Sequence, residues 1–109
     1  MSENSARSFN VTLTEQAEGV VVRVQGEVDI VTAPVLQRHL DSAIAAGRPV
    51  VVIDLSATSF LDARGVAVLV STREQLSRNG GRLVISKPPS LVRRVLELAD
   101  QIDRLDIED

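Results

Sequence analysis

The sequence predicts an α/β domain with a mixed β-sheet of four to five strands, an N-terminal hairpin and three to four helices. Short runs rich in valine and isoleucine alternate with amphipathic stretches of helical length, which is the pattern of strand–helix–strand units. Two strand-like runs open the chain with only a short turn between them, and this spacing favours a hairpin. The 109 residues suffice for one hydrophobic core, so we expect a single domain.

The first two strands are expected to pair with each other. Residues 9–14 alternate apolar and polar side chains, which is the period of a half-buried strand. Glu18 and Gly19 supply a turn, and residues 20–24 are nearly all valine, which is typical of a strand. Residues 1–8 are polar and of mixed charge, so we expect a flexible N-terminus there and a domain spanning residues 9–109.

A first helix is predicted between Thr32 and Gly47. Thr32 is a good N-cap residue, and Pro34 fits the first turn because its missing N–H would have no helical partner there. Apolar side chains recur at helical spacing, at Ala33, Leu36, Leu40, Ala43 and Ile44. Residues 50–55 are then apolar without alternation, which is typical of a central strand covered on both faces.

The remaining elements repeat this order. Residues 56–61 are interpreted as a loop, and a second helix is expected to begin near Asp62. Residues 82–85 favour another strand, a last helix opens near Ser90, and residues 105–107 favour an edge strand. Strand–helix–strand connections imply parallel neighbours with right-handed crossovers, so the opening hairpin makes the sheet mixed.

The composition argues against catalysis, metal binding and nucleic-acid binding. The chain has no cysteine, and its one histidine, His39, lies inside the predicted first helix without a partner set for catalysis. The net charge is −3, the basic residues are scattered, and aromatic residues make up 2% of the chain. We therefore expect no enzyme activity, cofactor, metal or direct contact with nucleic acid. No apolar run is long enough to cross a bilayer, so we expect a cytoplasmic protein without membrane contact.

Carboxylates at strand ends are the remaining candidates for chemistry. Asp54 ends the predicted central strand, where a response-regulator receiver carries its phosphorylated aspartate. A receiver also needs an acidic pair after its first strand, and residues 13–19 offer only the separated Glu15 and Glu18. Asp54 is therefore expected to accept hydrogen bonds from nearby loop N–H groups.

The start of the second helix is more informative. Asp62 is predicted to cap this helix through its carboxylate. Arg64 opposes the helix dipole in the first turn, so it either points into water or contacts a partner. Gly65 costs about 0.5–1 kcal/mol relative to alanine. That cost indicates the close approach of another backbone, from this fold or from a partner.

Residues 51–66 resemble the central signature of STAS domains. In that signature an apolar strand ends in Asp-Leu and is followed by Ser/Thr-Phe, by an Asp-Ser-x-Gly motif and by an apolar helix. The corresponding residues here are Asp54-Leu55, Ser59-Phe60 and Asp62-Ala63-Arg64-Gly65. Residues 26–29 and 32–33 resemble the family's earlier Gly-Glu-Leu-Asp and Thr-Ala segments, and the likeness extends over residues 9–107.

This resemblance implies an anti-sigma factor antagonist, which binds an anti-sigma factor of the serine kinase type and releases a sigma factor. In the family, the kinase phosphorylates a serine directly after the motif aspartate, and the added charge and bulk break the complex. Ala63 occupies that position, so we expect no phosphate there and a chain that stays competent to bind or is regulated otherwise. Thr58 and Ser59 are weaker candidates for phosphorylation, since turn hydrogen bonds also explain their hydroxyls.

The expected contact surface consists of Asp29, Thr58, Ser59, Asp62, Ala63, Arg64 and Gly65. The resemblance leaves a second role open, that of a STAS module in a stressosome-like signalling complex or a transport system. A homodimer is also left open.

Overall fold

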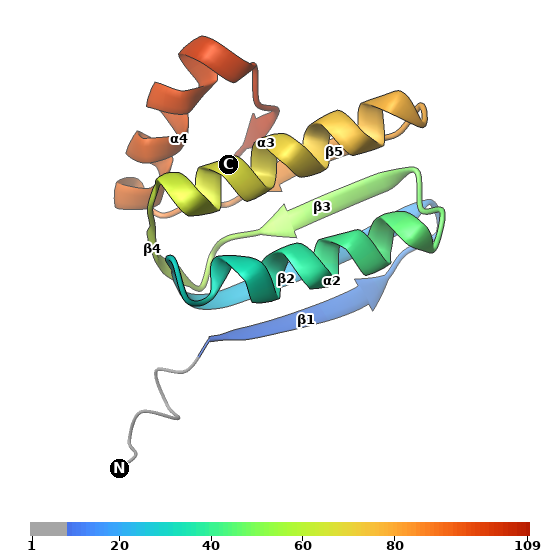
Figure 1. Cartoon of the computed structure of the whole chain (residues 1–109), viewed down its shortest axis with the longest axis horizontal. Helices are drawn as coiled ribbons and strands as arrows, with labels where there is room; N and C mark the ends of the chain where they lie inside the picture. The colour runs from blue at the N-terminus through green and yellow to red at the C-terminus, as the bar shows by residue number, and fades with distance from the viewer. Residues whose placement is uncertain (1–8) are drawn as a thin grey trace.

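A computed structural model describes residues 9–109, in which a hairpin is followed by alternating helices and strands (Figure 1). The expected flexible segment, residues 1–8, lies outside this range. The strands are β1 (Asn10–Glu15), β2 (Gly19–Val28), β3 (Val50–Asp54), β4 (Thr58–Leu61), β5 (Arg82–Ser86) and β6 (Ile107–Glu108). The helices are α2 (Ala33–Ala45), α3 (Ala63–Arg78) and α4 (Ser90–Asp103).

The strands of the described range form one mixed sheet, which confirms the predicted fold class. Along the sheet the order is β1-β2-β3-β5-β6, and β4 pairs with β2 outside this path. β1 runs antiparallel to β2, as predicted for the hairpin, and the other pairs are parallel. The sheet has six strands, more than the four to five expected, because the segment interpreted as a loop contains β4.

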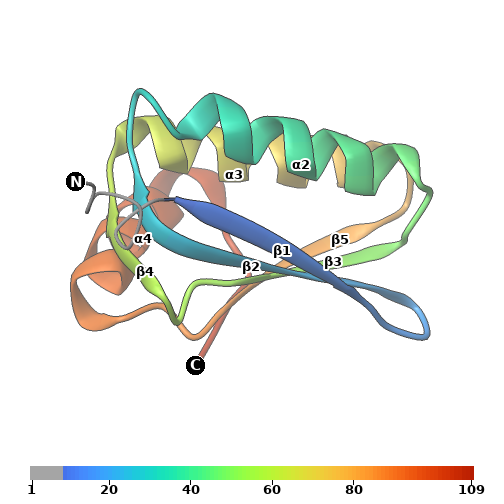
Figure 2. The same cartoon turned by 90° about the horizontal axis from the view of Figure 1, so that it is seen from below.

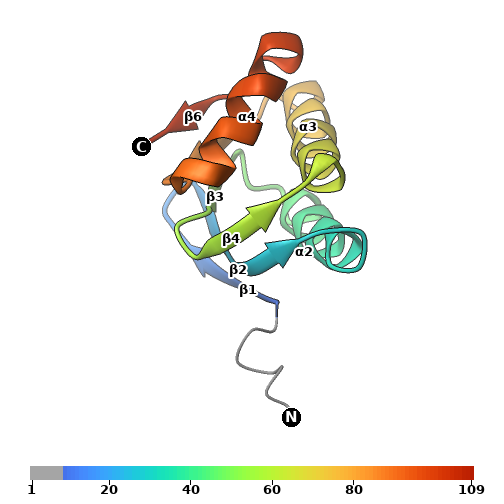
Figure 3. The same ribbon diagram turned by 90° about the vertical axis from the view of Figure 1, so that its left-hand side faces the viewer.

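β2 is long enough to pair with two strands on the same side. Residues 19–23 pair with β3, whereas residues 26–28 pair with β4. The register shifts between Gly26 and Glu27, and Gly26 has a φ of 102°, which glycine adopts without steric cost. The shift leaves Ser59 of β4 without a partner residue on β2, so the bulge lies in β4. The end of β2 lies beside β4, as Figure 3 shows.

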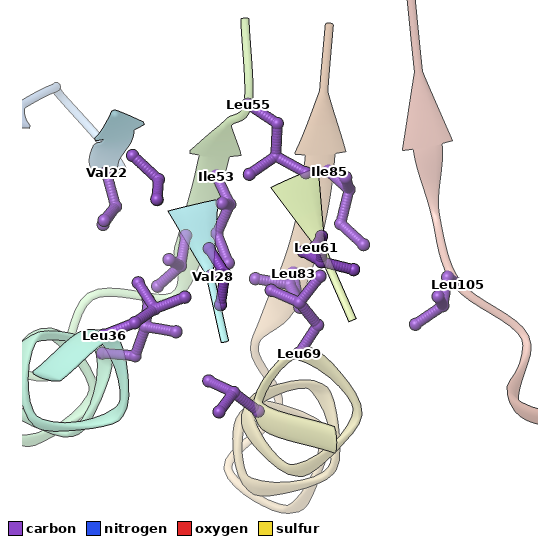
Figure 4. Close-up of a cluster of buried hydrophobic side chains, with 14 of the residues drawn as sticks. Val22, Val28, Leu36, Ile53, Leu55, Leu61, Leu69, Leu83, Ile85 and Leu105 are labelled. Carbon is purple, nitrogen blue, oxygen red and sulfur yellow. The ribbon is translucent and has the colours of Figure 1, made fainter. Parts of the chain in front are cut away.

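Helices α2 and α3 cover one face of the sheet (Figure 2). Leu36 of α2 and Leu69 of α3 are fully buried against strand residues such as Ile53 (Figure 4). Each such side chain contributes roughly 1.5–3 kcal/mol through its burial. On the opposite face Val52 is only half-buried, so β3 alternates in burial. The expectation that residues 50–55 are covered on both faces is therefore wrong.

Helix α4 lies at one end of the sheet, against β4 and α3. Val92 and Leu96 of α4 are buried, and Leu105 follows them into the core before β6 pairs with β5. None of the helices in residues 9–109 combines the length and the apolar character that a bilayer crossing requires.

Candidate partner-binding site

Asp62 fixes the start of α3. It is the N-cap residue, with extended backbone, and its Oδ1 accepts hydrogen bonds from the N–H of Arg64 at 2.9 Å and of Gly65 at 3.3 Å. The predicted cap is thus confirmed. The Asp62 N–H donates to the carbonyl oxygen of Val28 at 3.2 Å, which ties this helix end to the end of β2.

Gly65 lets α3 pack directly on the strand ends. An added Cβ would lie 2.8 Å from Cγ of Leu61 and 2.9 Å from Cγ1 of Val28, closer than packed carbon atoms approach. The close approach expected from the sequence is therefore present within the fold, although it involves side chains of β2 and β4 and not another backbone. Gly65 itself is buried.

Asp29 organises the loop between β2 and α2. Its Oδ1 accepts hydrogen bonds from the N–H of Val31 at 2.9 Å and of Thr32 at 3.0 Å. The backbone donors Thr32 and Val31 hold the pKa of the Asp29 carboxyl below its ordinary value, because they stabilise the charged form.

Thr32 occupies the N-cap position of α2, but its hydroxyl makes no cap bond. The hydroxyl instead donates to the carbonyl oxygen of Glu27 at 2.6 Å and accepts from the N–H of Asp29 at 2.9 Å. The expected capping by Thr32 is thus replaced by a closed loop in which Asp29 binds the backbone N–H groups. This loop therefore has a defined shape beside the start of α3.

Exposed apolar side chains surround these two ordered segments. Ile30 is 59% exposed and Val31 74% exposed in the β2–α2 loop, and Phe60 is 47% exposed on β4. A groove of about 290 Å³ runs between the starts of α2 and α3, lined by Ile30, Ala33, Pro34, Gln37, Arg64, Ala67 and Val68. We use the name α3-start surface for this groove together with the exposed residues Ile30, Val31, Phe60, Ala63 and Arg64.

The hydroxyls of β4 differ in access. Thr58 is 1% exposed, and its Oγ1 donates to the carbonyl oxygen of Val24 at 2.8 Å. Ser59, the next residue, is exposed. Of the contact residues expected from the sequence, Thr58 and Gly65 are buried, whereas Ala63 and Arg64 are exposed on the α3-start surface. Ser59 is exposed in a different groove, which it lines together with Pro89 and Leu91.

Sequence reasoning missed Ile30, Val31 and Phe60 as surface residues. The available signal was the isoleucine–valine pair that directly follows Asp29 in a predicted loop. Exposing two large apolar side chains does not stabilise a turn, so such a pair indicates a contact with another molecule. Phe60 is exposed because Ser59 has no partner residue on β2, so the buried positions of β4 are Thr58 and Leu61 and do not alternate.

Asp54 lies away from the α3-start surface. Its Oδ1 accepts a hydrogen bond from the N–H of Ser56 at 2.9 Å, the loop role that the sequence predicts. Burial works to raise the pKa of Asp54, but the bonds from Ser56 and the charges of Lys87 and Arg23 outweigh it and lower the pKa.

His39 makes a local contact within α2. Its Nδ1 lies 2.9 Å from the carbonyl oxygen of Val35, one turn earlier in the helix. Within residues 9–109, no group of three or more histidine, cysteine, aspartate or glutamate side chains is placed to hold a metal ion. The polar side chains of this end of the domain thus order the backbone around an exposed, partly apolar surface.

A mixed sheet with α2 and α3 on one face and an ordered, exposed start of α3 defines this small α/β domain. Residues 10–109 match the family model described as the STAS domain. The chain belongs to the STAS domain family.

Relatives of known role cover most of the chain. The anti-sigma-F factor antagonist RsfB of Mycobacterium tuberculosis is 31% identical over 91 residues, which are 84% of this chain and 74% of RsfB. The anti-sigma-B factor antagonist of Bacillus subtilis is 26% identical over 100 residues, which are 92% of this chain and 91% of the relative.

Solved structures agree with this assignment. An anti-sigma factor antagonist from Mycobacterium paratuberculosis superposes with a TM-score of 0.80 and 32% identity, over 92% of this chain and 86% of that chain. Unphosphorylated SpoIIAA gives a TM-score of 0.72 over 94% of this chain and 88% of that chain, and at 22% identity this likeness shows the fold alone.

Proposed function

We propose that this chain is an anti-sigma factor antagonist, which binds an anti-sigma factor of the serine kinase type and thereby releases a sigma factor. Relatives with this role, similar over most of the chain, support the proposal. The observation that carries it is the α3-start surface, where the exposed Arg64 and Ile30 line one groove and their chain neighbours Ala63 and Val31 are exposed as well.

The surface has the composition of a protein-binding patch. Ile30, Val31 and Phe60 offer apolar area, and Arg64 adds a cation that can form several hydrogen bonds to a carboxylate. The cap of Asp62 and the loop bonds of Asp29 already hold the backbone in one conformation. Little backbone freedom would then be lost when a partner binds, and this favours affinity.

In this proposal Ala63 removes the usual switch. Ala63 is the first residue of α3 and is exposed, so a serine at this position would be accessible to a kinase. Alanine has no hydroxyl and forms no phosphoester. Thr58 is buried, which leaves Ser59 as the exposed hydroxyl of the two weaker candidates. We therefore infer a surface that stays competent to bind unless another input acts on it.

The test begins with capture of the tagged chain's partners from a lysate of its native host. The recovered anti-sigma kinase is then titrated calorimetrically with wild-type chain, with Arg64→Glu and with Arg78→Glu. Both arginines are exposed on α3, at its first and last turns. We expect Arg64→Glu to weaken binding by at least about tenfold and Arg78→Glu to leave it unchanged.

Comparing the Arg64→Glu and Arg78→Glu variants also controls for effects on folding. An added negative charge at a helix start is favourable to the helix, whereas the same charge at its end is unfavourable. Arg64→Glu should therefore be at least as stable as Arg78→Glu, so its loss of binding would not reflect unfolding. Equal binding by the two variants would overturn the proposed surface. Recovery of transporter or stressosome subunits without a kinase would instead favour the alternative role.

A further inference from the structure

The two edges of the described sheet differ in how well they are protected. An edge strand presents unpaired N–H and C=O groups, and proteins usually block them with lysine, proline, a bulge or a very short strand. β6 forms one edge with two residues. β1 forms the other edge with six residues, in continuous register with β2 and without lysine or proline (Figure 1). The β1 edge is therefore open to a further strand.

Backbone groups of alternate β1 residues point away from β2. The N–H of Gln16 donates to the carbonyl oxygen of Gly19 at 2.9 Å, so this even-numbered residue faces β2. Because the direction alternates along an antiparallel strand, the N–H and C=O groups of Val11 and Leu13 point to the outer edge. Among residues 9–109 no strand other than β2 pairs with β1.

The side chains of β1 also leave room for a neighbour. Leu13 is 41% exposed, although it lies opposite the fully buried Val22 and on the same face of the sheet. Val11 lies on that face too and is half-buried. A strand beside β1 would cover the exposed side of Leu13, and its backbone would satisfy the outward N–H and C=O groups. The chemistry of this edge thus calls for an extended strand.

The sequence of β1 makes a second copy of β1 a matching strand. Directly opposite residues of an antiparallel pair lie on the same face, so a two-fold axis must lie between two copies of one residue. An axis at Thr12 sets Val11 opposite Leu13 of the second copy. It also sets Asn10 opposite Thr14 of the second copy. Apolar side chains then meet on the face that α2 and α3 cover, and uncharged polar ones meet on the other face.

Charge favours this register. Residues 10–14 carry no charge, so no like charges meet when two copies pair about Thr12. The one charged residue of β1, Glu15, forms an ion pair with Arg48 of its own chain. An axis at Leu13 would instead set Val11 opposite Glu15 of the second copy, an apolar side chain against a carboxylate.

We propose that β1 pairs with β1 of a second copy of this chain, antiparallel and centred on Thr12, so that the two sheets join into one. A two-fold interface must be self-complementary, and the backbone and side chains of residues 10–14 meet this requirement. One short strand is small compared with the roughly 1,600 Å² of a standard interface, so the dimer forms reversibly and with modest affinity. A strand of another protein would need no such symmetry, and self-association of the pure chain separates the two cases.

Sedimentation velocity of the purified full chain, from micromolar to millimolar concentration, tests the association. We expect wild type to pass from monomer to dimer. Leu13→Lys should weaken dimerisation by at least about tenfold, because each copy then carries a charge into the interface. Leu98→Lys changes an exposed leucine of α4 and is the control, so it should dimerise as wild type does. A monomer at every concentration, or equal dimers of Leu13→Lys and wild type, would reject the proposal.

Amide hydrogen exchange of the wild-type chain, followed by NMR, tests the strand pairing without any substitution. The N–H groups of Val11 and Leu13 should exchange at least about tenfold more slowly where the dimer predominates than in the dilute monomer. The N–H of Thr12 faces β2 in both states, so its exchange should change far less. Dimerisation that leaves the exchange of Val11 and Leu13 unchanged would place the interface elsewhere and overturn the proposal.

Opposite charges at Thr12 test the position of the axis. Homodimers of Thr12→Lys set like charges opposite each other, and so do homodimers of Thr12→Glu, whereas a heterodimer sets opposite charges together. Heterodimers should therefore exceed their statistical share by at least about threefold in native mass spectrometry. The same two substitutions at Thr14, which lies opposite Asn10 and not opposite its own copy, are the control and should mix nearly statistically.

Statistical mixing of the Thr12 variants, or an equal preference at both positions, would contradict an axis at Thr12. Thr12 and Thr14 are both exposed, so neither pair of substitutions disturbs the core. None of residues 10–15 belongs to the α3-start surface. Because these assays use the chain alone, their outcome does not depend on whether an anti-sigma factor is the partner.

Discussion

At the scale of single residues, Gly65 determines how closely α3 approaches the strand ends. Gly65→Ala would gain up to about 1 kcal/mol of helix propensity but would place a Cβ within 3 Å of Leu61 and Val28. Overpacking of this kind costs about 1–3 kcal/mol, so we expect a net loss of about 1–2 kcal/mol in the free energy of unfolding. Urea denaturation measures the change, with Ser77→Ala at an exposed position of α3 as the control. If Gly65→Ala were as stable as wild type, the side chains of Leu61 and Val28 would be able to move aside and accommodate the added Cβ.

A second residue-scale prediction concerns pH and Asp29. The donated N–H groups of Thr32 and Val31 lower the pKa of Asp29 below 3.8 in the folded chain. A lowered folded-state pKa contributes stability that is present above the unfolded value and is lost as the pH falls through the folded value. Asp29→Asn should therefore be less stable than wild type near neutral pH, and the difference should shrink below about pH 4.

Urea midpoints of wild type and Asp29→Asn, measured across this pH range, check the prediction. A difference that stays constant with pH would mean that the shape of the side chain, and not its charge, holds the β2–α2 loop. The carboxyl carbon shift of Asp29, followed by NMR, gives the pKa directly.

At the scale of elements, one buried hydroxyl adds to the backbone pairing that attaches β4 to β2. Thr58→Val keeps the shape of the side chain but removes the bond to the carbonyl oxygen of Val24. We expect a loss of about 1 kcal/mol in the free energy of unfolding, because a buried acceptor loses this donor, and Thr58→Ser should retain most of it. Thermal unfolding of the two variants measures the difference. If Thr58→Val were as stable as wild type, the side-chain contribution of β4 to stability would come from the packing of Leu61 and not from the Thr58 hydrogen bond.

The sequence predicts well those elements whose apolar side chains recur with a clear helical or strand period. The hairpin, the three helices and β5 follow from side-chain alternation and helical spacing. β4 has four residues, and its buried positions, Thr58 and Leu61, do not alternate because the pairing is irregular. The apolar run of β3 suggested cover on both faces, but valine is also favoured on a half-buried sheet surface for its β-branched shape.

The residues of the candidate site likewise fall into those that local sequence predicts and those that depend on the tertiary arrangement. Asp62 and Gly65 were predictable because local backbone chemistry requires them, as a helix cap and as a close contact. Ile30, Val31 and the burial of Thr58 depend on where β2 ends relative to α3. That position depends on the register shift between β2 and β4 at Gly26 and Glu27, which no short sequence pattern reveals.

At the scale of the whole molecule, one end of the sheet gathers the features of a binding surface. The end of β2 brings its loop beside the start of α3, and β4 lies between this end and α4 (Figure 3). The rest of the sheet serves as a rigid support, with α2 and α3 on one face. A phosphate at the first residue of α3 should therefore weaken binding without affecting the fold.

Ala63→Ser makes this last expectation testable, and it rests on the proposed function. We expect the serine variant to fold as wild type does and to bind the anti-sigma kinase with unchanged affinity, because residue 63 is exposed. Incubation with that kinase and ATP should add one phosphate to Ala63→Ser and none to wild type, measured by intact mass.

The phosphate would lie at the start of α3, where the helix N–H groups favour a negative charge, so the fold should remain stable. It would also stand beside the carboxylate of Asp62 in the middle of the α3-start surface, so binding should fall by at least about tenfold. Ala67→Ser, exposed one turn further along α3, is the control and should stay unmodified. A phosphate on wild type, at Ser59 or elsewhere, would contradict the expectation that this kinase leaves the wild-type chain unmodified and competent to bind.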